Sequence, residues 1–458
     1  MKIARVELPE FGAEAACPAI PLDVYRRRMA DAVARMERDG LDCLVVYADR
    51  EHFANMAFLT GFDPRFEEAL LLLDRRGHSL LMVGNECMGY LPAPELKIEV
   101  ELFQEFSLMG QPRESSRPLR DILSGFGIGR GARVGCVGWK CYGAAGVSDV
   151  PSYIVDAIRD LTGDGALVVN ATGIFTNLAD GLRIVCEPEQ IAQFEHAATV
   201  TSGGIWRLLR RLREGIAEQE LERHLDSAGL PLSCHRMISF GEKAGRGLSS
   251  PGHGRARLGD PYTTALGVTG SLTCRAGCIA RGPEDLPAGT RDFYSAFASN
   301  YFDVVAAWYE TVRVGATGGE VFSAVEARRD DRLFRLAVNP GHYIHLDEWV
   351  NSPFAPGSAA VLRSGAAVQM DIIPVSRGPF CCINAEDGIV LADAALRDGL
   401  ARRWPALWQR VEERREFMEG VIGIRLHESV LPLGNIPAWL PPYALALDRV
   451  LVSERQCK

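Results

Sequence analysis

In the N-terminal part of the chain, the pattern of hydrophobic and polar positions predicts strands that alternate with helices. Apolar residues recur at helical spacing from Leu22 to Gly40, and the glycine marks a plausible helix end. Short apolar runs then predict buried strands at 41–48, 67–74, 78–84, 133–139 and 166–172. A helix over 152–161 lies between the last two strands. Residues 20–176 are therefore predicted to form an α/β domain with a mixed or largely parallel sheet.

The pattern changes near Leu182. Residues 183–215 predict a long helix that is broken at Gly203-Gly204, and 217–229 predict a second, amphipathic helix. Beyond Ser239 the chain reads as glycine-rich strands and loops.

A second pair of helices, 291–314 and 319–329, precedes another glycine-rich strand block at 339–393. The order helices, sheet, helices, sheet predicts an α+β domain over 182–400 with a repeated form. Residues 401–458 are predicted to hold a C-terminal helix and a proline-rich tail that wraps the surface.

Composition excludes several classes of partner. The chain has 458 residues, 47% of them hydrophobic, and a net charge of −9 with no offsetting run of Lys and Arg. A nucleic-acid or anionic-membrane partner is therefore not expected. No stretch approaches the roughly 20 apolar residues of a membrane span, and the first residues lack an apolar signal segment. We expect a cytoplasmic protein with reduced cysteines, and we interpret the adjacent Cys381 and Cys382 as core residues.

Several segments resemble a known enzyme family. They are GLRIVCEPEQIAQFEHAATV (181–200), SSPGHGRARLGD (249–260), NPGHYIHLDEW (339–349), VQMDIIP (368–374) and NAEDGIVLAD (384–393). In order and spacing they resemble the first helix, substrate-side histidine loop, ligand-histidine loop and two acidic strands of creatinase, prolidase and aminopeptidase P. The resemblance covers roughly residues 20–400. It implies a pita-bread domain preceded by a smaller α/β domain, and a homodimer.

The family usually binds two divalent cations through two Asp, one His and two Glu, and the cations activate a water. Aligned on the Gly259-Asp260 turn, this chain has Ala265 at the first Asp. Aligned on CIAR (278–281), with a two-residue insertion in between, it has Cys278 at the second. Two cations repel one another, so the loss of two hard anionic donors argues against a dinuclear centre.

Three of the five positions keep ligand-type side chains: His342, Asp371 and Glu386. We expect no resident metal cofactor. A single zinc at these three residues, with or without the thiolate of Cys278, is not excluded, because imidazole, carboxylate and thiolate can form a tetrahedral site.

The resemblance to creatinase, which also lacks this ligand set, implies a histidine that moves a proton to the scissile C–N bond. His253 matches that histidine, and His342, Asp371 and Glu386 would orient the substrate and tune it. Four further residues are predicted to contact the substrate: Cys278, Arg281, His345 and Trp349. Trp349 stands where the family commonly has a second histidine.

The leading hypothesis is a hydrolase that cleaves a C–N bond in a small amidine- or amide-like substrate without metal. One alternative is a metal-dependent Xaa-Pro aminopeptidase, or a lyase, on the same fold. A thiolate nucleophile at Cys278 is another. The alternative from a different class is a binding module that kept the fold after losing catalysis. In each case the partner is a small molecule or short peptide.

Overall fold

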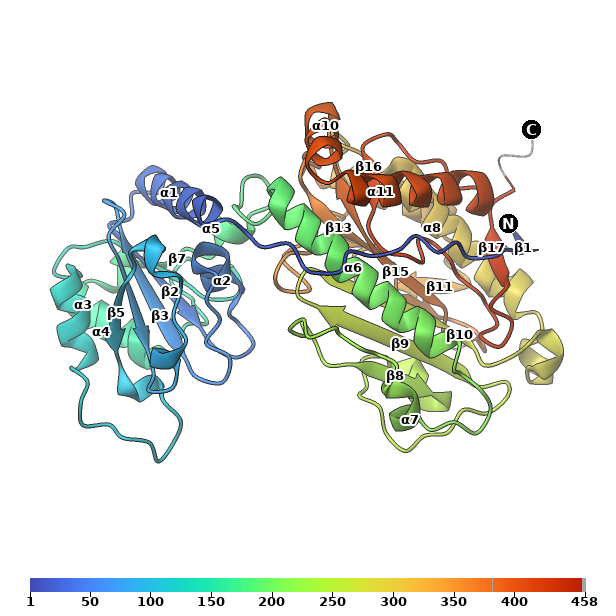
Figure 1. Ribbon diagram of the computed structural model, residues 1–458, viewed down its shortest axis with the longest axis horizontal. Coiled ribbons are helices and arrows are strands. Elements are labelled where there is room, and N and C mark those ends of the chain that lie inside the picture. Colours follow the sequence, from blue (N-terminus) through green and yellow to red (C-terminus); the bar gives the residue numbers. More distant parts are fainter. Residues whose placement is uncertain (381, 455–458) are drawn as a thin grey trace. The chain divides into compact units, whose positions relative to one another are not determined.

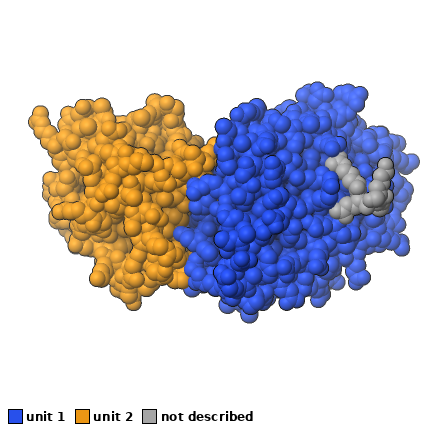
Figure 2. Space-filling view, turned by 90° about the horizontal axis from the view of Figure 1, so that it is seen from above, with its two compact units in different colours: residues 1–19, 185–458 blue, residues 20–184 orange. Residues whose placement is uncertain are grey.

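The computed structural model describes residues 1–380 and 382–454. Cys381 and residues 455–458, the end of the predicted tail, lie outside the described residues, whereas Cys382 is half-buried. The chain divides into two compact units (Figure 2): unit 1 is Met1–Ala19 with Val185–Lys458, and unit 2 is Ile20–Ile184.

Unit 2 is built on a six-stranded mixed sheet in the order β5-β4-β3-β2-β6-β7 (Figure 1). β2 runs parallel to β6, and β6 to β7, whereas β3 is antiparallel to both of its neighbours. The strands are β2 (Cys43–Ala48), β3 (Ala69–Asp74), β4 (Ser79–Val83), β5 (Glu99–Leu102), β6 (Val134–Val137) and β7 (Val168–Asn170). The helices are α1 (Leu22–Arg38), α2 (Ala54–Thr60), α3 (Leu119–Phe126), α4 (Ser152–Thr162) and α5 (Gly173–Thr176).

All five strands predicted for this region are present within a few residues, because four of them are apolar runs buried in the sheet and the fifth, β7, buries Val168. β5 was not predicted. Its residues are exposed or only half-buried and include two glutamates, so the sequence carries no apolar run there.

Unit 1 contains a curved sheet in the order β12-β13-β15-β10-β9-β8, with β16 also paired to β15. Its strands are β8 (Met237–Phe240), β9 (Pro261–Val268), β10 (Ser271–Cys278), β12 (His342–Tyr343), β13 (Ala367–Asp371), β15 (Asn384–Leu391) and β16 (Val430–Pro432). Two small antiparallel pairs accompany it: β1 (Lys2–Arg5) with β17 (Arg449–Val452), and β11 (Phe334–Leu336) with β14 (Pro374–Ser376). The helices are α6 (Pro188–Leu209), α7 (Glu218–Glu222), α8 (Ser299–Thr311), α9 (Gly318–Arg328), α10 (Ala394–Arg403) and α11 (Pro405–Phe417).

Two helix predictions need correction. α6 runs unbroken through Gly203-Gly204 and packs on β9 and β10 (Figure 1). A Cβ at position 204 would lie 2.7 Å from Leu266, so this glycine permits close helix–sheet packing and does not end the helix. The second helix, predicted over 217–229, is only the short α7, and a loop follows it.

The proline-rich tail is also corrected. Much of it does not lie on the surface: β16 pairs with β15, and Trp439 and Leu440 are fully buried. The tail therefore completes the core of unit 1. Unit 2 has a mixed sheet and unit 1 an antiparallel one, each accompanied by helices, so the α+β fold class predicted from the sequence is confirmed. Among the helices formed by the described residues, none combines the length and apolar character that crossing a bilayer requires.

Candidate functional site

Four strands of the unit 1 sheet place one residue each in a single row. The pairing register sets Ala265 of β9 opposite Cys274 of β10, Cys274 opposite Glu386 of β15, and Glu386 opposite Asp371 of β13. Directly paired residues point to the same face of a sheet, so these four side chains share one face.

That face is turned away from α6. Thr201 of α6 bonds to Ser271 and Thr273, at 3.0 and 2.9 Å between oxygen atoms, and side chains alternate along a strand. Leu272 and Cys274 therefore project to the opposite face, where the row lies.

The register corrects one sequence assignment. Cys274, not Cys278, stands opposite Ala265 and Glu386. Four residues along a strand separate the two cysteines, a distance of about 13 Å, so Cys278 lies beyond the row. The hairpin joining β9 and β10 turns through only Thr269 and Gly270, which leaves no room for the insertion that the alignment assumed.

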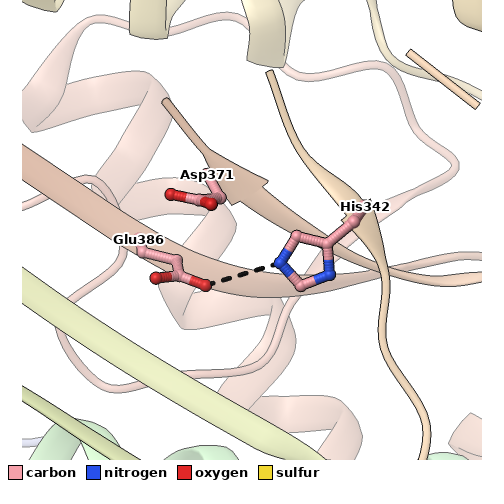
Figure 3. A group of neighbouring side chains, drawn as sticks. All are labelled: His342, Asp371 and Glu386. Atoms are coloured by element: carbon pink, nitrogen blue, oxygen red, sulfur yellow. Dashed lines mark ion pairs between the residues drawn. The ribbon is translucent and has the colours of Figure 1, made fainter. Parts of the chain in front are cut away.

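His342, Asp371 and Glu386 come together as the sequence predicted (Figure 3). They lie on β12, β13 and β15, and one potential ligand atom from each lies within 4.8 Å of the others. All three side chains are buried. His342 Nε2 is 3.7 Å from Glu386 Oε1, and its Nδ1 is 3.2 Å from the carbonyl oxygen of Tyr343. At its polar end the row thus presents two carboxylates, and the buried imidazole of His342 faces them.

The loop after β12 adds two residues to the site. Glu348 brings Oε1 to 3.1 Å from His342 Nε2, which gives the imidazole a second carboxylate. Trp349 stacks on the imidazole, with ring centroids 4.1 Å apart and planes 19° apart. This contact places the predicted substrate-binding residue Trp349 at the site. A flat aromatic face favours a cationic imidazole.

Several buried atoms around this point have no hydrogen-bond partner among the described residues. They include His342 Nε2, whose approach to the two glutamates lacks hydrogen-bond geometry, and Asp371 Oδ1. Gln369 joins them: its Nε2 donates to Glu386 Oε1 at 3.3 Å and to the Leu272 carbonyl at 2.7 Å, while its Oε1 has no partner. Buried polar groups are normally paired, so one unpaired donor and two unpaired acceptors mark a place for a ligand.

The charges of the group depend on burial and on one another. Burial disfavours the imidazolium of His342, but Glu348 and Glu386 outweigh it and raise its pKa to about 10. Burial raises the pKa of Asp371 to about 6, against the attraction of His342. Burial and the charge of Asp371 raise the pKa of Glu386 well above its usual value.

The other end of the row is apolar. Ala265 and Cys274 pack with Met237 and Leu272 in one hydrophobic cluster. Burial, reinforced by Glu386, raises the pKa of the Cys274 thiol well above its usual value, so the thiol stays neutral. A pair of divalent cations does not fit this donor set, since the positions that would bridge them offer a methyl group and a neutral thiol. The donor set of His342, Asp371 and Glu386 does fit one cation.

The remaining predicted site residues lie elsewhere. His253 is exposed, on a loop where Gly252 N donates to Glu218 Oε2 at 2.6 Å. The same carboxylate accepts from the Phe240 amide, and Phe240 pairs with Tyr262, three residues or about 10 Å along β9 from the row.

Arg281 is exposed and forms an ion pair with Asp285 at 2.8 Å. His345 is buried and meets Phe194 of α6 edge to face, with centroids 5.3 Å apart, so it packs on the helix side. The structure does not bring His253, Cys278, Arg281 or His345 to the His342 group.

Three site residues were missed from the sequence, and two of them left a signal. Gln369 lies two residues before Asp371 on a strand, so strand periodicity places both on one face. Cys274 follows from reading Thr269-Gly270 as a two-residue hairpin turn, which pairs position 265 with 274. Glu348 left no comparable signal, because only the path of a loop returns it to His342.

No protein family model and no curated protein matches the sequence. Solved structures do resemble the fold. A prolidase from Thermococcus sibiricus has a TM-score of 0.63 at 16% identity, covering 82% of this chain and 95% of its own. An X-Pro aminopeptidase from Thermotoga maritima has a TM-score of 0.62 at 13% identity, covering 93% and 99%. Dipeptidase PepE from Mycobacterium ulcerans has a TM-score of 0.61 at 19% identity, covering 81% and 94%. The chain therefore has the fold of the prolidase and aminopeptidase P structures, the pita-bread fold that its sequence motifs resemble.

Proposed function

We propose that the protein is a hydrolase that cleaves a C–N bond in a small amide- or amidine-like substrate or a short peptide, without a two-metal centre. The observation that supports this most directly is that three neighbouring side chains of the site each hold a buried polar atom with no hydrogen-bond partner among the described residues: Nε2 of His342, Oδ1 of Asp371 and Oε1 of Gln369. An amide or amidine and an attacking water offer complementary donors and acceptors. The solved structures of this fold include a dipeptidase and an X-Pro aminopeptidase, and this similarity favours a C–N bond as the bond that is cleaved.

The proposed chemistry divides between an acid and a base. Asp371 accepts a proton from water as the water oxygen bonds to the carbonyl or amidine carbon. The imidazolium of His342 donates its Nε2 proton to the leaving nitrogen as the C–N bond breaks. The proton held by Asp371 then returns to His342, so atoms and charge balance. Glu348 and Glu386 hold the imidazole in its cationic form.

A second candidate is a hydrolase that uses one divalent cation, favoured by the three ligand atoms within 4.8 Å. His342, Asp371 and Glu386 would hold the cation, which would polarise the scissile group and lower the pKa of a bound water. Against it stands Glu348, which lies 3.1 Å from the same imidazole nitrogen that a metal would need.

A substrate screen combined with metal analysis tests the proposal. Protein purified without chelators is assayed on guanidino compounds, small amides and Xaa-Pro dipeptides, and its metal content is measured. We expect turnover with less than one equivalent of bound metal, and a loss of about a hundredfold or more in His342→Gln. One tightly bound cation per chain that restores activity after chelation would replace the first candidate with the second.

The matched control is His253→Gln, which changes an exposed imidazole on the Glu218-anchored loop. We expect it to keep nearly full activity. Loss in His253→Gln with activity retained in His342→Gln would return the catalytic role to His253. No turnover of any compound would favour the non-catalytic binding module.

We also propose that the protein is a homodimer and that it is located in the cytoplasm. This proposal is supported by the resemblance and by the composition, and light scattering of the purified chain tests the dimer.

A further inference from the structure

A pocket lies in unit 1 beside the small β1–β17 ribbon. It has a volume of about 590 Å³. Three arginines line it, Arg5, Arg291 and Arg449, together with Tyr294 and Tyr443, and no acidic residue does. β1 and β17 lie next to the N label in Figure 1. In a chain with a net charge of −9, a pocket lined by three cations and no carboxylate is unexpected.

Two of the arginines face one another directly. The antiparallel register pairs Arg5 with Arg449, so their side chains leave the ribbon on the same face. Like charges at directly paired positions destabilise a β-ribbon unless another charge neutralises them. A pair of this kind is best explained by a negative group that binds between them.

The protein itself supplies little of that negative charge. Arg5 Nε is 3.6 Å from Asp448 Oδ2, but both side chains are more than half exposed, so this pair contributes little. Arg291 reaches only a backbone carbonyl, that of Leu286, at 3.5 Å. Among the residues that the structure describes, neither Arg291 nor Arg449 takes part in an ion pair.

The wall of the pocket also holds tyrosine side chains in fixed places. Tyr294 lies on the π-helical turn Tyr294–Ala298 and donates its hydroxyl to the Met1 carbonyl at 2.8 Å, which ties this turn to β1. Tyr443 is only 3% exposed. The arginines thus surround a concave surface with a buried phenol, which suits a small ligand better than an extended polymer.

We propose that this pocket binds a compact small-molecule anion with at least two negative charges, such as a phosphate ester or a polycarboxylate. Arg5 and Arg449 approach the anion from the ribbon, and Arg291 approaches it from the turn before α8. Guanidinium groups bind phosphate and carboxylate oxygens through paired N–H donors. The pocket shares no residue with the His342 group, so this site does not depend on the proposed hydrolase activity.

Calorimetric titration of the full chain with pyrophosphate tests the proposal at low ionic strength. We expect saturable binding of one pyrophosphate per chain. Arg449→Gln and Arg291→Gln should each raise Kd about tenfold or more, because each removes one charge-assisted contact. Citrate is titrated in parallel: tighter binding of pyrophosphate identifies a phosphate ligand, and tighter binding of citrate identifies a carboxylate ligand.

The matched control is Arg335→Gln, which removes an exposed arginine from the other two-stranded ribbon, β11–β14. It should leave Kd unchanged. The proposal is overturned if neither anion binds saturably, or if Arg335→Gln weakens binding as much as Arg449→Gln does.

Thermal unfolding gives a second readout that does not depend on the heat of binding. Without an anion, Arg449→Gln should unfold at the same temperature as the wild type or higher, since it removes the opposed like charge. Pyrophosphate should raise the unfolding temperature of the wild type and of Arg335→Gln by the same amount, and that of Arg449→Gln by clearly less. A lower unfolding temperature for Arg449→Gln without anion would show that the arginine pair stabilises the ribbon by itself and would contradict the proposal.

Discussion

Two groups of buried charged side chains in unit 1 differ in how completely their atoms are paired. Glu195 of α6 is fully buried, and Arg410 and Arg414 of α11 meet it. Its Oε1 accepts a hydrogen bond from each arginine at 2.8 Å, and its Oε2 accepts another from Arg410 at 2.8 Å. Nη2 of Arg414 also donates to Asn435 Oδ1, at 2.7 Å. This group is closed, and it joins two helices.

The group around His342 is equally buried but open. Asp371 Oδ1 and His342 Nε2 have no hydrogen-bond partner among the described residues, and two of its carboxylates have raised pKa values. The comparison teaches that buried charge alone does not mark a functional site. Incomplete pairing within a group of buried charges is the better marker, because unpaired buried atoms cost stability unless water or a ligand satisfies them.

Glu195→Gln should produce the largest change in stability. It leaves the buried guanidinium of Arg414 without its carboxylate and leaves Arg410 with Glu14 alone, at 3.1 Å. Breaking a buried pair in this way costs about 3–5 kcal/mol. The midpoint of urea unfolding measures the effect. Glu416→Gln, which changes an exposed glutamate of α11, should change the free energy of unfolding by no more than about 0.5 kcal/mol. Equal effects of the two substitutions would show that the Glu195 group is not a closed structural pair.

Asp371→Asn, in contrast to Glu195→Gln, should not lower the stability of the protein. Burial raises the pKa of Asp371 to about 6, so folding favours its protonated form, and above that pH the charged carboxylate costs stability. The neutral amide removes this cost. At pH 8 we therefore expect an unfolding midpoint at or above that of the wild type, with kcat/KM lower by about a hundredfold or more. A destabilisation as large as that of Glu195→Gln would place Asp371 in a structural pair instead.

The pH profile of kcat/KM tests the acid and base roles. Activity needs Asp371 ionised, so it should fall about tenfold per pH unit below pH about 6. It also needs His342 protonated, so it should fall again above pH about 10. Asp371→Asn should lose the acid limb. A profile that stays flat from pH 5 to about 10 would contradict these assignments.

Trp349→Leu should have the smallest effect. The indole face stacked on His342 stabilises the imidazolium by about 0.5–1 kcal/mol, so its loss should move the alkaline limb down by less than about one pH unit. Trp408→Leu, a partly buried tryptophan in the α10–α11 core, should leave the limb in place. An unchanged limb in Trp349→Leu would show that the ring only packs.

The sequence by itself determined the fold class, five strands of unit 2 and the meeting of His342, Asp371 and Glu386. The fold class and the strands follow from apolar periodicity, and the meeting of the three residues follows from short motifs. In both cases residues close in sequence determine the secondary structure and the face on which each side chain lies. It also determined that no full set of hard donors exists for two cations.

The tertiary structure decided which residues surround that group. The pairing register places Cys274, not Cys278, opposite Ala265. The hairpin between β9 and β10 is shorter than the alignment assumed, and this shifts every later residue along its strand. The path of a loop brought Glu348 to His342, and the anchoring of another loop on Glu218 kept His253 away from the row. Such contacts join residues far apart in the chain, so the local sequence does not specify them before the core is packed.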